Sequence, residues 1–341
     1  MISLILQSWK GLKPQDKVVY LHWIWCTREQ RNVPLSIASL SEKLKIKEST
    51  VRGSVARLYA ADKVIFNDEQ SSYAIAHPVG FDSSQAQPEE NLISILAMLG
   101  IGSALIDERA EVLAKRLLRA VLVSLADDLG IIERVSFSHL SSITGMTVQR
   151  LRRYKDELID DGYIIKFVPG GNAPSLYKKV ASICIMNPEK LTRKNIALWR
   201  FDAGSLVSNR ELNSCIHNIQ TKYQSTPVLN IEEINRHRLA GRVHHLFDEL
   251  VSQLIRSKLL EKHLICSRGI IAKTDQITVN KRLQILWRRY IESVSDVALD
   301  ILLEHIEKSG PEYPIDVYFF RHKDTCYVLS NVGRSRCDNT N

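Results

Sequence analysis

The sequence has little of what marks fibrous, disordered or disulfide-rich proteins. Its 341 residues include only 15 glycines and 10 prolines, and 45% are hydrophobic, which excludes collagen-like and wholly disordered chains. The six cysteines form no Cys-x-x-Cys pair, so a thiolate metal site or redox motif is not indicated. We expect free thiols in a reducing cytosol.

Signals for membranes and for nucleotide chemistry are missing as well. The longest uncharged apolar run, residues 92–106, is too short for a membrane-spanning helix, and the opening MISLILQSWK has no basic residue ahead of its apolar stretch. The sequence contains no P-loop, serine-hydrolase or dinucleotide-binding motif. We therefore expect a cytoplasmic protein that is not an enzyme, contacts no membrane and needs no cofactor.

What the chain does have is length, positive charge and an internal repeat. Its length suits two or three domains, and 46 lysines and arginines against 38 acids give a net charge of +8, which favours a polyanionic partner. Residues 36–66 and 136–166 share one apolar plan: a short helix, a tight connection and a second helix. The apolar positions are Ile37, Leu40, Leu44, Val51, Val55 and Leu58 in the first segment, and Phe137, Leu140, Ile143, Leu151, Tyr154 and Leu158 in the second.

Each segment is flanked by elements that complete a small domain. A helix is expected before each, at Gln15–Cys26 and Lys115–Leu129. A β-hairpin is expected after each, with strands at 64–66 and 73–76 around the turn NDEQSS, and at 163–168 and 176–185 around the turn PGGNAPS. The order is helix, helix, turn, helix and hairpin.

The two second helices carry a resemblance to a known family. KESTVRGSVARLYAADKVI (47–65) and GMTVQRLRRYKDELIDDGYI (145–164) resemble the recognition helices of GntR-type and MarR-type bacterial regulators, with Thr50, Val51, Arg52 and Leu58 carrying the likeness in the first. Gly162 precedes the hairpin strand as in that family, whereas the first segment has Asp62 there. The resemblance covers residues 18–76 and 115–185. It implies a mainly α fold with small β-hairpin wings (α+β), arranged as two tandem winged helix-turn-helix domains. It also implies a bacterial, nucleoid-associated protein that binds double-stranded DNA.

These patterns predict the division of the chain. We expect winged-helix domain 1 at 1–80, a polar linker at 81–91, winged-helix domain 2 with its preceding helices at 92–188, a helical C-terminal domain at 189–332 and a disordered tail at 333–341. The C-terminal domain should contain helices near 231–262 and 277–308 and a hairpin at 315–330. We expect it to mediate a homodimer or to bind a partner.

Residues at the start of each second helix and off its apolar stripe are the candidates for DNA contact, because a recognition helix presents that end to the major groove. Arg52 and Arg152 can pair bidentately with guanine, and Gln149 with adenine. The full set is Lys47, Ser49, Thr50, Arg52 and Arg57 in the first segment, Thr147, Gln149, Arg150, Arg152 and Arg153 in the second, and Asn172 and Lys178 in its wing.

The expected function is sequence-specific binding of duplex DNA by a transcriptional regulator that occupies a promoter or operator. Two alternatives remain open: a plasmid or phage replication initiator that binds origin repeats, and a non-enzymatic assembly protein whose winged helices contact protein. A metal site is not expected, because the pairs Glu233 with His237 and His244 with Asp248 have no clustered third ligand.

Overall fold

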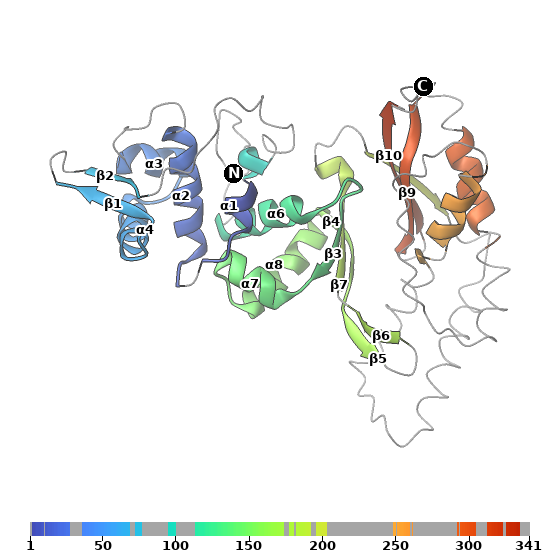
Figure 1. The fold of residues 1–341 in the computed structure, drawn as a ribbon, viewed down its shortest axis with the longest axis horizontal. Coiled ribbons are helices and arrows are strands. Elements are labelled where there is room, and N and C mark those ends of the chain that lie inside the picture. Colours follow the sequence, from blue (N-terminus) through green and yellow to red (C-terminus); the bar gives the residue numbers. More distant parts are fainter. Residues whose placement is uncertain are drawn as a thin grey trace, which may run out of the picture. The chain divides into compact units, whose positions relative to one another are not determined.

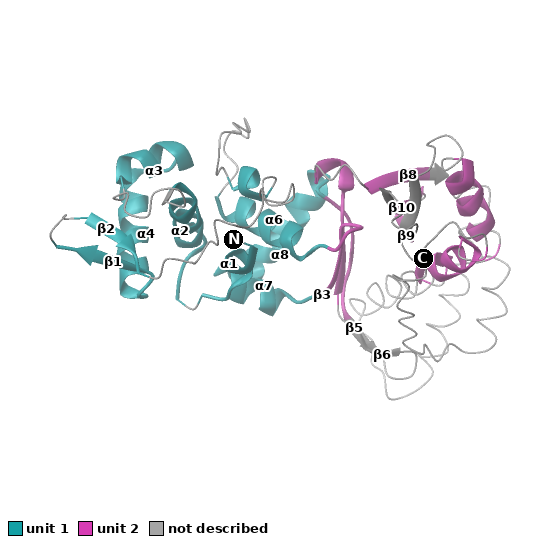
Figure 2. Ribbon diagram, turned by 45° about the horizontal axis from the view of Figure 1, so that its top comes forward, with its two compact units in different colours: residues 1–126, 135–163 teal, residues 127–134, 164–341 magenta. Residues whose placement is uncertain are grey.

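The computed structural model divides the chain into two compact units (Figures 1 and 2). Unit 1 comprises residues 1–126 and 135–163, and unit 2 comprises residues 127–134 and 164–341. Helices and small antiparallel sheets make the protein mixed α+β, and none of the helices in the described part has the length and apolar character to cross a bilayer. The structure describes residues 2–9, 11–27, 36–68, 72–76, 95–99, 113–173, 177–180, 182–191, 196–202, 248–249, 251–259, 261, 292, 294–304, 312–322 and 325–334.

The first copy of the repeat, residues 14–76, lies in unit 1 after a short helix, α1 (Ile2–Leu6). It consists of α2 (Pro14–Thr27), α3 (Ile37–Leu44), α4 (Glu48–Ala60), β1 (Val64–Asn67) and β2 (Ser72–Ile75), and the two strands pair antiparallel. The three helices pack against one another. Their buried side chains include Val18, Leu21, Leu40, Val51 and Leu58. The expected helices and hairpin of this copy are therefore confirmed.

The second copy, residues 113–186, has the same order with three strands added: one ahead of the paired helices and two between the strands of the hairpin. It comprises α6 (Leu113–Leu125), β3 (Ile131–Val135), α7 (Phe137–Thr144), α8 (Val148–Asp160), β4 (Ile164–Val168), β5 (Gly171–Ala173), β6 (Tyr177–Val180) and β7 (Ser182–Met186). One sheet has the strand order β3-β7-β4, and β5 pairs with β6. The segment PGGNAPS is therefore partly paired strand rather than turn throughout.

Two features of the second copy correct the expectation. α6 ends at Leu125 instead of Leu129, because the Asp127 carboxylate accepts two backbone N–H bonds and Gly130 adopts φ +79°, which together close a turn. This turn leads into β3, which was not expected. The sequence IIERV is too short to show an alternating pattern by itself.

The two copies correspond position by position at an offset of one hundred residues. α3 and α7 begin and end at corresponding positions, as do α4 and α8. Ser36 and Ser136 each accept the N–H three residues later and so cap the following helix. Ser41 and Ser141 each donate a 2.6 Å bond to the carbonyl five residues later. The repeat inferred from apolar spacing thus extends to the polar contacts.

The turn ahead of each hairpin also corresponds. Asp62 and Gly162 both take left-handed backbone angles, with φ +53° and +73°. The following residue then donates its N–H at 2.9 Å to the carbonyl of Leu58 or Leu158. The replacement of glycine by Asp62 in the first copy therefore leaves this turn intact.

Unit 2 builds one hydrophobic core from two sheets. β9 (Glu312–His322) and β10 (Thr325–Arg334) form the expected hairpin, and β8 (Ile196–Asp202), which was not expected, pairs antiparallel with β10 after a short 3-10 helix, η1 (Pro188–Lys190). The core is shared with the sheet β3-β7-β4. Its buried members are Leu129, Ile131, Val168, Ile183, Ile185, Tyr318, Phe320 and Leu329.

The C-terminal region is therefore helix and sheet rather than helix with a terminal hairpin. Residues 251–259 and 294–304 are helical, as expected, whereas 231–247 and 277–291 lie outside the described residues. Ser252 exchanges hydrogen bonds with the backbone of Phe319 at 2.8 and 3.1 Å, so the helix at 251–259 lies at the edge of β9 that does not pair with β10. β10 continues to Arg334, two residues into the expected tail, and 335–341 lie outside the described residues.

Candidate nucleic-acid interface

The start of α8 is set by a turn and a cap. Gly145 ends α7 with φ +70°, and the Thr147 hydroxyl accepts the N–H of Arg150 at the first turn of α8. The predicted stripe of Leu151, Tyr154 and Leu158 is buried. Side chains off this stripe are consequently turned outward, and among the expected DNA contacts of this helix Thr147, Gln149, Arg152 and Arg153 are exposed.

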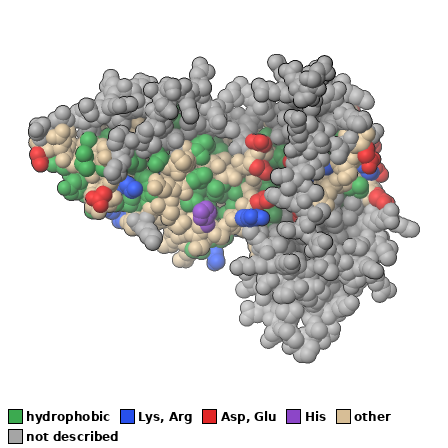
Figure 3. Space-filling model, in the orientation of Figure 1, with side chains coloured by type: hydrophobic (Ala, Val, Ile, Leu, Met, Phe, Trp, Pro, Cys, Tyr) green, Lys and Arg blue, Asp and Glu red, His purple; other side chains and the backbone are tan. Residues whose placement is uncertain are grey.

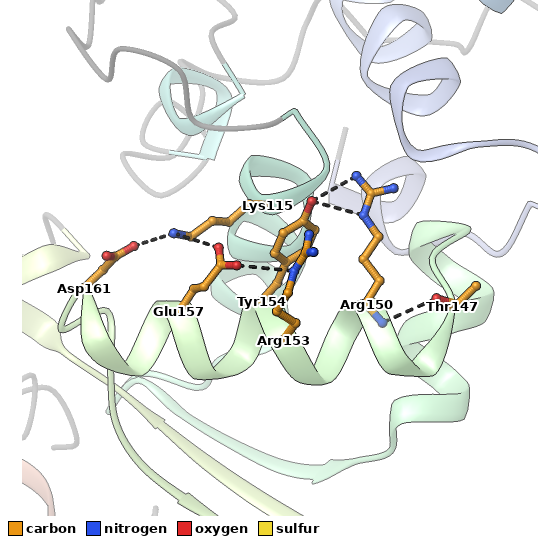
Figure 4. A network of polar contacts seen from close by, with 7 residues as sticks. All are labelled: Lys115, Thr147, Arg150, Arg153, Tyr154, Glu157 and Asp161. Atoms are coloured by element: carbon orange, nitrogen blue, oxygen red, sulfur yellow. Dashed lines mark hydrogen bonds and ion pairs between the residues drawn. The ribbon is translucent and has the colours of Figure 1, made fainter.

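Arg150 is held more firmly than the other candidates. Its Nε and Nη2 donate to the Tyr154 hydroxyl at 3.1 and 2.9 Å (Figure 4). The same contact satisfies the hydroxyl of a tyrosine that is otherwise buried. Arg150 is half-buried, so we assign it mainly to fixing α8, with its charge still adding to the local potential.

Charge is segregated along α8. Its first half carries Arg150, Arg152 and Arg153, and acids dominate its second half. Lys115 of α6 neutralises that acidic end, with its Nζ 2.5 Å from Asp161 and 3.4 Å from Glu157 (Figure 4). The basic end coincides with the positive end of the helix dipole, which favours an anionic ligand there.

The first copy presents a weaker basic surface. Lys47, Ser49 and Arg52 are exposed and Thr50 is half-buried. Arg52 lies 3.4 Å from Glu48, and both side chains are at least half exposed, so this pair holds Arg52 only loosely.

Arg57 forms an ion pair inside the first copy. It donates two 2.8 Å bonds to the carboxylate of Asp16, a wholly buried residue of α2. The hydrogen bond to Asp16 raises the pKa of Arg57 above its ordinary value. Asp16 also accepts the N–H of Lys13, which caps α2. We therefore assign Arg57 mainly to holding α4 against α2, and its contact with DNA stays a prediction.

The remaining candidates and the metal hypothesis lie partly outside the described part. Asn172 is placed on β5 and Lys178 on β6 by their backbone, while their side chains are not among the described ones. Asp248 pairs with Lys166 at 2.6 Å, and His244 lies outside the described residues. The described residues contain no cluster of three metal-ligating side chains, and Cys26, Cys184 and Cys326 are thiols rather than disulfides.

One basic residue near α8 was missed by the sequence reasoning. Lys13 is exposed, and its backbone lies 3.6 Å from the position that a Cβ on Gly145 would take. The sequence KPQD signals a helix start at Lys13, but nothing in it indicates that this residue reaches the second copy. The backbone of this residue lies beside the turn that leads into α8.

Charge on the visible surface is dispersed. In the view of Figure 3, basic and acidic side chains are scattered among hydrophobic and neutral ones over the described surface. On the face drawn, the described residues therefore form no broad basic patch.

Comparison with protein-family models, curated proteins and solved structures finds no match to this chain. What the protein does must therefore be inferred from its own residues and contacts.

Proposed function

We propose that the protein binds duplex DNA through two tandem winged helix-turn-helix segments, with α8 and α4 as the recognition helices. It regulates transcription by occupying a promoter or operator, so no covalent step is required. The C-terminal region supplies self-association or a partner contact.

The observation that carries the proposal is the combination of repeat and charge in the second copy. Its strand order β3-β7-β4, with two helices between β3 and β4, is the topology that a winged helix requires. At the start of α8, Gln149 and Arg152 are exposed beside further arginines. These residues supply both a phosphate-binding charge and hydrogen-bonding groups for base edges.

Selection from a random duplex pool tests the proposal directly. The full chain should enrich a motif, and Arg152→Ala should degrade one half of it while reducing the salt slope of binding by about 1. Arg52→Ala should degrade the other half more weakly. Arg200→Ala is the matched control. Arg200 is exposed, as Arg152 is, and its loss changes the net charge by the same amount. Unlike Arg152, it lies on β8 and pairs with Glu189.

Failure to enrich any motif at low and moderate salt would refute sequence-specific binding. Motifs that recur as tandem repeats beside an origin would favour replication initiation over promoter occupancy.

A second candidate, protein contact by the first copy, is favoured by one observation. Tyr59, Ile65 and Phe66 are 51%, 50% and 41% exposed, and the rings of Tyr59 and Phe66 pack edge-on against Tyr73. An exposed apolar cluster of this kind is more typical of a protein interface than of a DNA surface. Phe66→Thr should then weaken partner capture while leaving DNA selection unchanged, and loss of both would contradict this assignment.

A further inference from the structure

Residues 8–9 and 11–17, called here the N-terminal segment, contact the last turn of α7 in the second copy. Trp9 N donates to Ser142 O at 3.3 Å and Ser8 Oγ donates to the same carbonyl at 3.1 Å. Lys17 Nζ donates to Ile143 O at 2.8 Å. These carbonyls belong to the last turn of α7, where a helix has no internal donors left. The segment therefore caps the end of α7.

The same segment is anchored in the first copy. Lys17 belongs to α2, the helix against which α3 and α4 pack. Its side chain is buried, its Nζ donates a second 2.8 Å bond to Gln7 O, and it lies 5.4 Å from the centre of the Trp9 ring. Trp9 in turn packs edge-on against Tyr20 of α2. One buried ammonium thus joins α2 of the first copy to α7 of the second.

The backbone of the N-terminal segment lies very close to Gly145, the residue that ends α7. Its left-handed backbone alone does not require glycine, because Lys45 takes φ +53° at the corresponding position of the first copy. A Cβ on Gly145, however, would lie 2.3 Å from the carbonyl oxygen of Leu12. The glycine is needed for this contact, since an alanine there would push residue 12 away.

We infer that the N-terminal segment holds the two helix-turn-helix segments as one rigid body. The recognition helices α4 and α8 then read two half-sites of a single duplex at one fixed separation. This inference rests on the proposed DNA-binding function. If only the linker at 81–91 joined the copies, the half-sites could be separated variably at little cost, because flexible linkers adapt to the span. A rigid pair loses simultaneous engagement when the half-sites are moved apart or rotated around the helix axis.

Spacing variants of the selected duplex test the fixed separation. Inserting half a helical turn between the half-sites should weaken binding by the wild-type chain about 100-fold, which is the loss expected when two linked contacts can no longer form together. Gly145→Ala should bind the original duplex less tightly and lose most of its dependence on spacing. Gly162→Ala is the matched control: φ is +73° there and no atom lies within 4 Å of the added methyl, so its spacing dependence should equal that of the wild type.

Tolerance of every spacing by the wild type, or identical behaviour of the two glycine variants, would overturn the inference. So would recovery of only one half-site, since a single half-site leaves no separation to fix.

A distance measurement tests the rigid pairing without DNA. Ketone-bearing residues introduced at the exposed positions Ser49 and Gln149 can carry spin labels on the full chain without touching its cysteines. Pulsed electron resonance should give one narrow distance distribution for wild type and Gly162→Ala, and a broad one for Gly145→Ala and Lys17→Met. A broad distribution in the wild type would overturn the rigid pairing even if DNA binds. A narrow one without any selected duplex would refute the DNA-binding function and the fixed half-sites, while leaving the rigid pairing in place.

Discussion

Replacing Arg57 with alanine distinguishes a structural arginine from a DNA-contacting one. The change leaves the buried carboxylate of Asp16 without its two 2.8 Å partners. Breaking a buried ion pair in this way costs about 3–5 kcal/mol. Arg57 is one-third exposed and Asp16 keeps its bond from Lys13 N, so we expect the lower end, about 3 kcal/mol.

Urea denaturation measures this loss. With an m-value of about 3 kcal/mol per molar urea, the midpoint of the transition that includes unit 1 should fall by about 1 M. Arg52→Ala is the control on the same helix: Arg52 is 67% exposed and only loosely paired with Glu48, so its loss should change stability by less than about 0.5 kcal/mol. An unchanged midpoint for Arg57→Ala together with reduced DNA affinity would refute the structural assignment.

Three further predictions address the N-terminal segment and unit 2. Burial lowers the pKa of Lys17 from 10.5 to about 7. Between these two pH values the Lys17 amine is protonated in the unfolded chain and neutral in the folded one. The free energy of unfolding should therefore rise with pH across this window, and by more in the wild type than in Lys17→Met. Thermal denaturation at both ends of the window measures this, and equal slopes would contradict it. Asp248→Asn removes the buried counter-ion of half-buried Lys166 and should destabilise unit 2 by about 3 kcal/mol in urea. Adding Lys166→Met should recover part of the loss, and no recovery would argue against a paired charge. Lys13→Ala should weaken binding to all duplexes alike and lower the salt slope by about 1, whereas a loss confined to one sequence would exclude a phosphate contact.

The sequence predicts the elements whose packing is local. In both copies the apolar spacing identified the paired helices, because residues three and four apart lie on one helix face. β3 and β8 escaped prediction because their hydrogen-bonding partners, β7 and β10, are distant in sequence. A short strand carries little signal apart from its neighbours.

In the candidate interface, too, the sequence predicts the local features and misses the contacts between residues that are distant in sequence. The outward positions of Gln149 and Arg152 followed from the buried stripe of α8. The role of Arg57 did not, since its partner Asp16 lies 41 residues earlier. The approach of Leu12 to Gly145 is also a long-range contact, which composition and periodicity do not encode.

The core of unit 2 has a consequence for biosynthesis. Ile131 at the start of the unit packs in one cluster with Leu329, close to the end of the chain. At a synthesis rate of about 5–20 residues per second, roughly 10–40 s separate the emergence of these two side chains from the ribosome. During that interval the inner face of the sheet β3-β7-β4 has no cover from β9 and β10. Chaperone shielding of the nascent chain, rather than the stability of the finished fold, should therefore limit the yield of soluble protein.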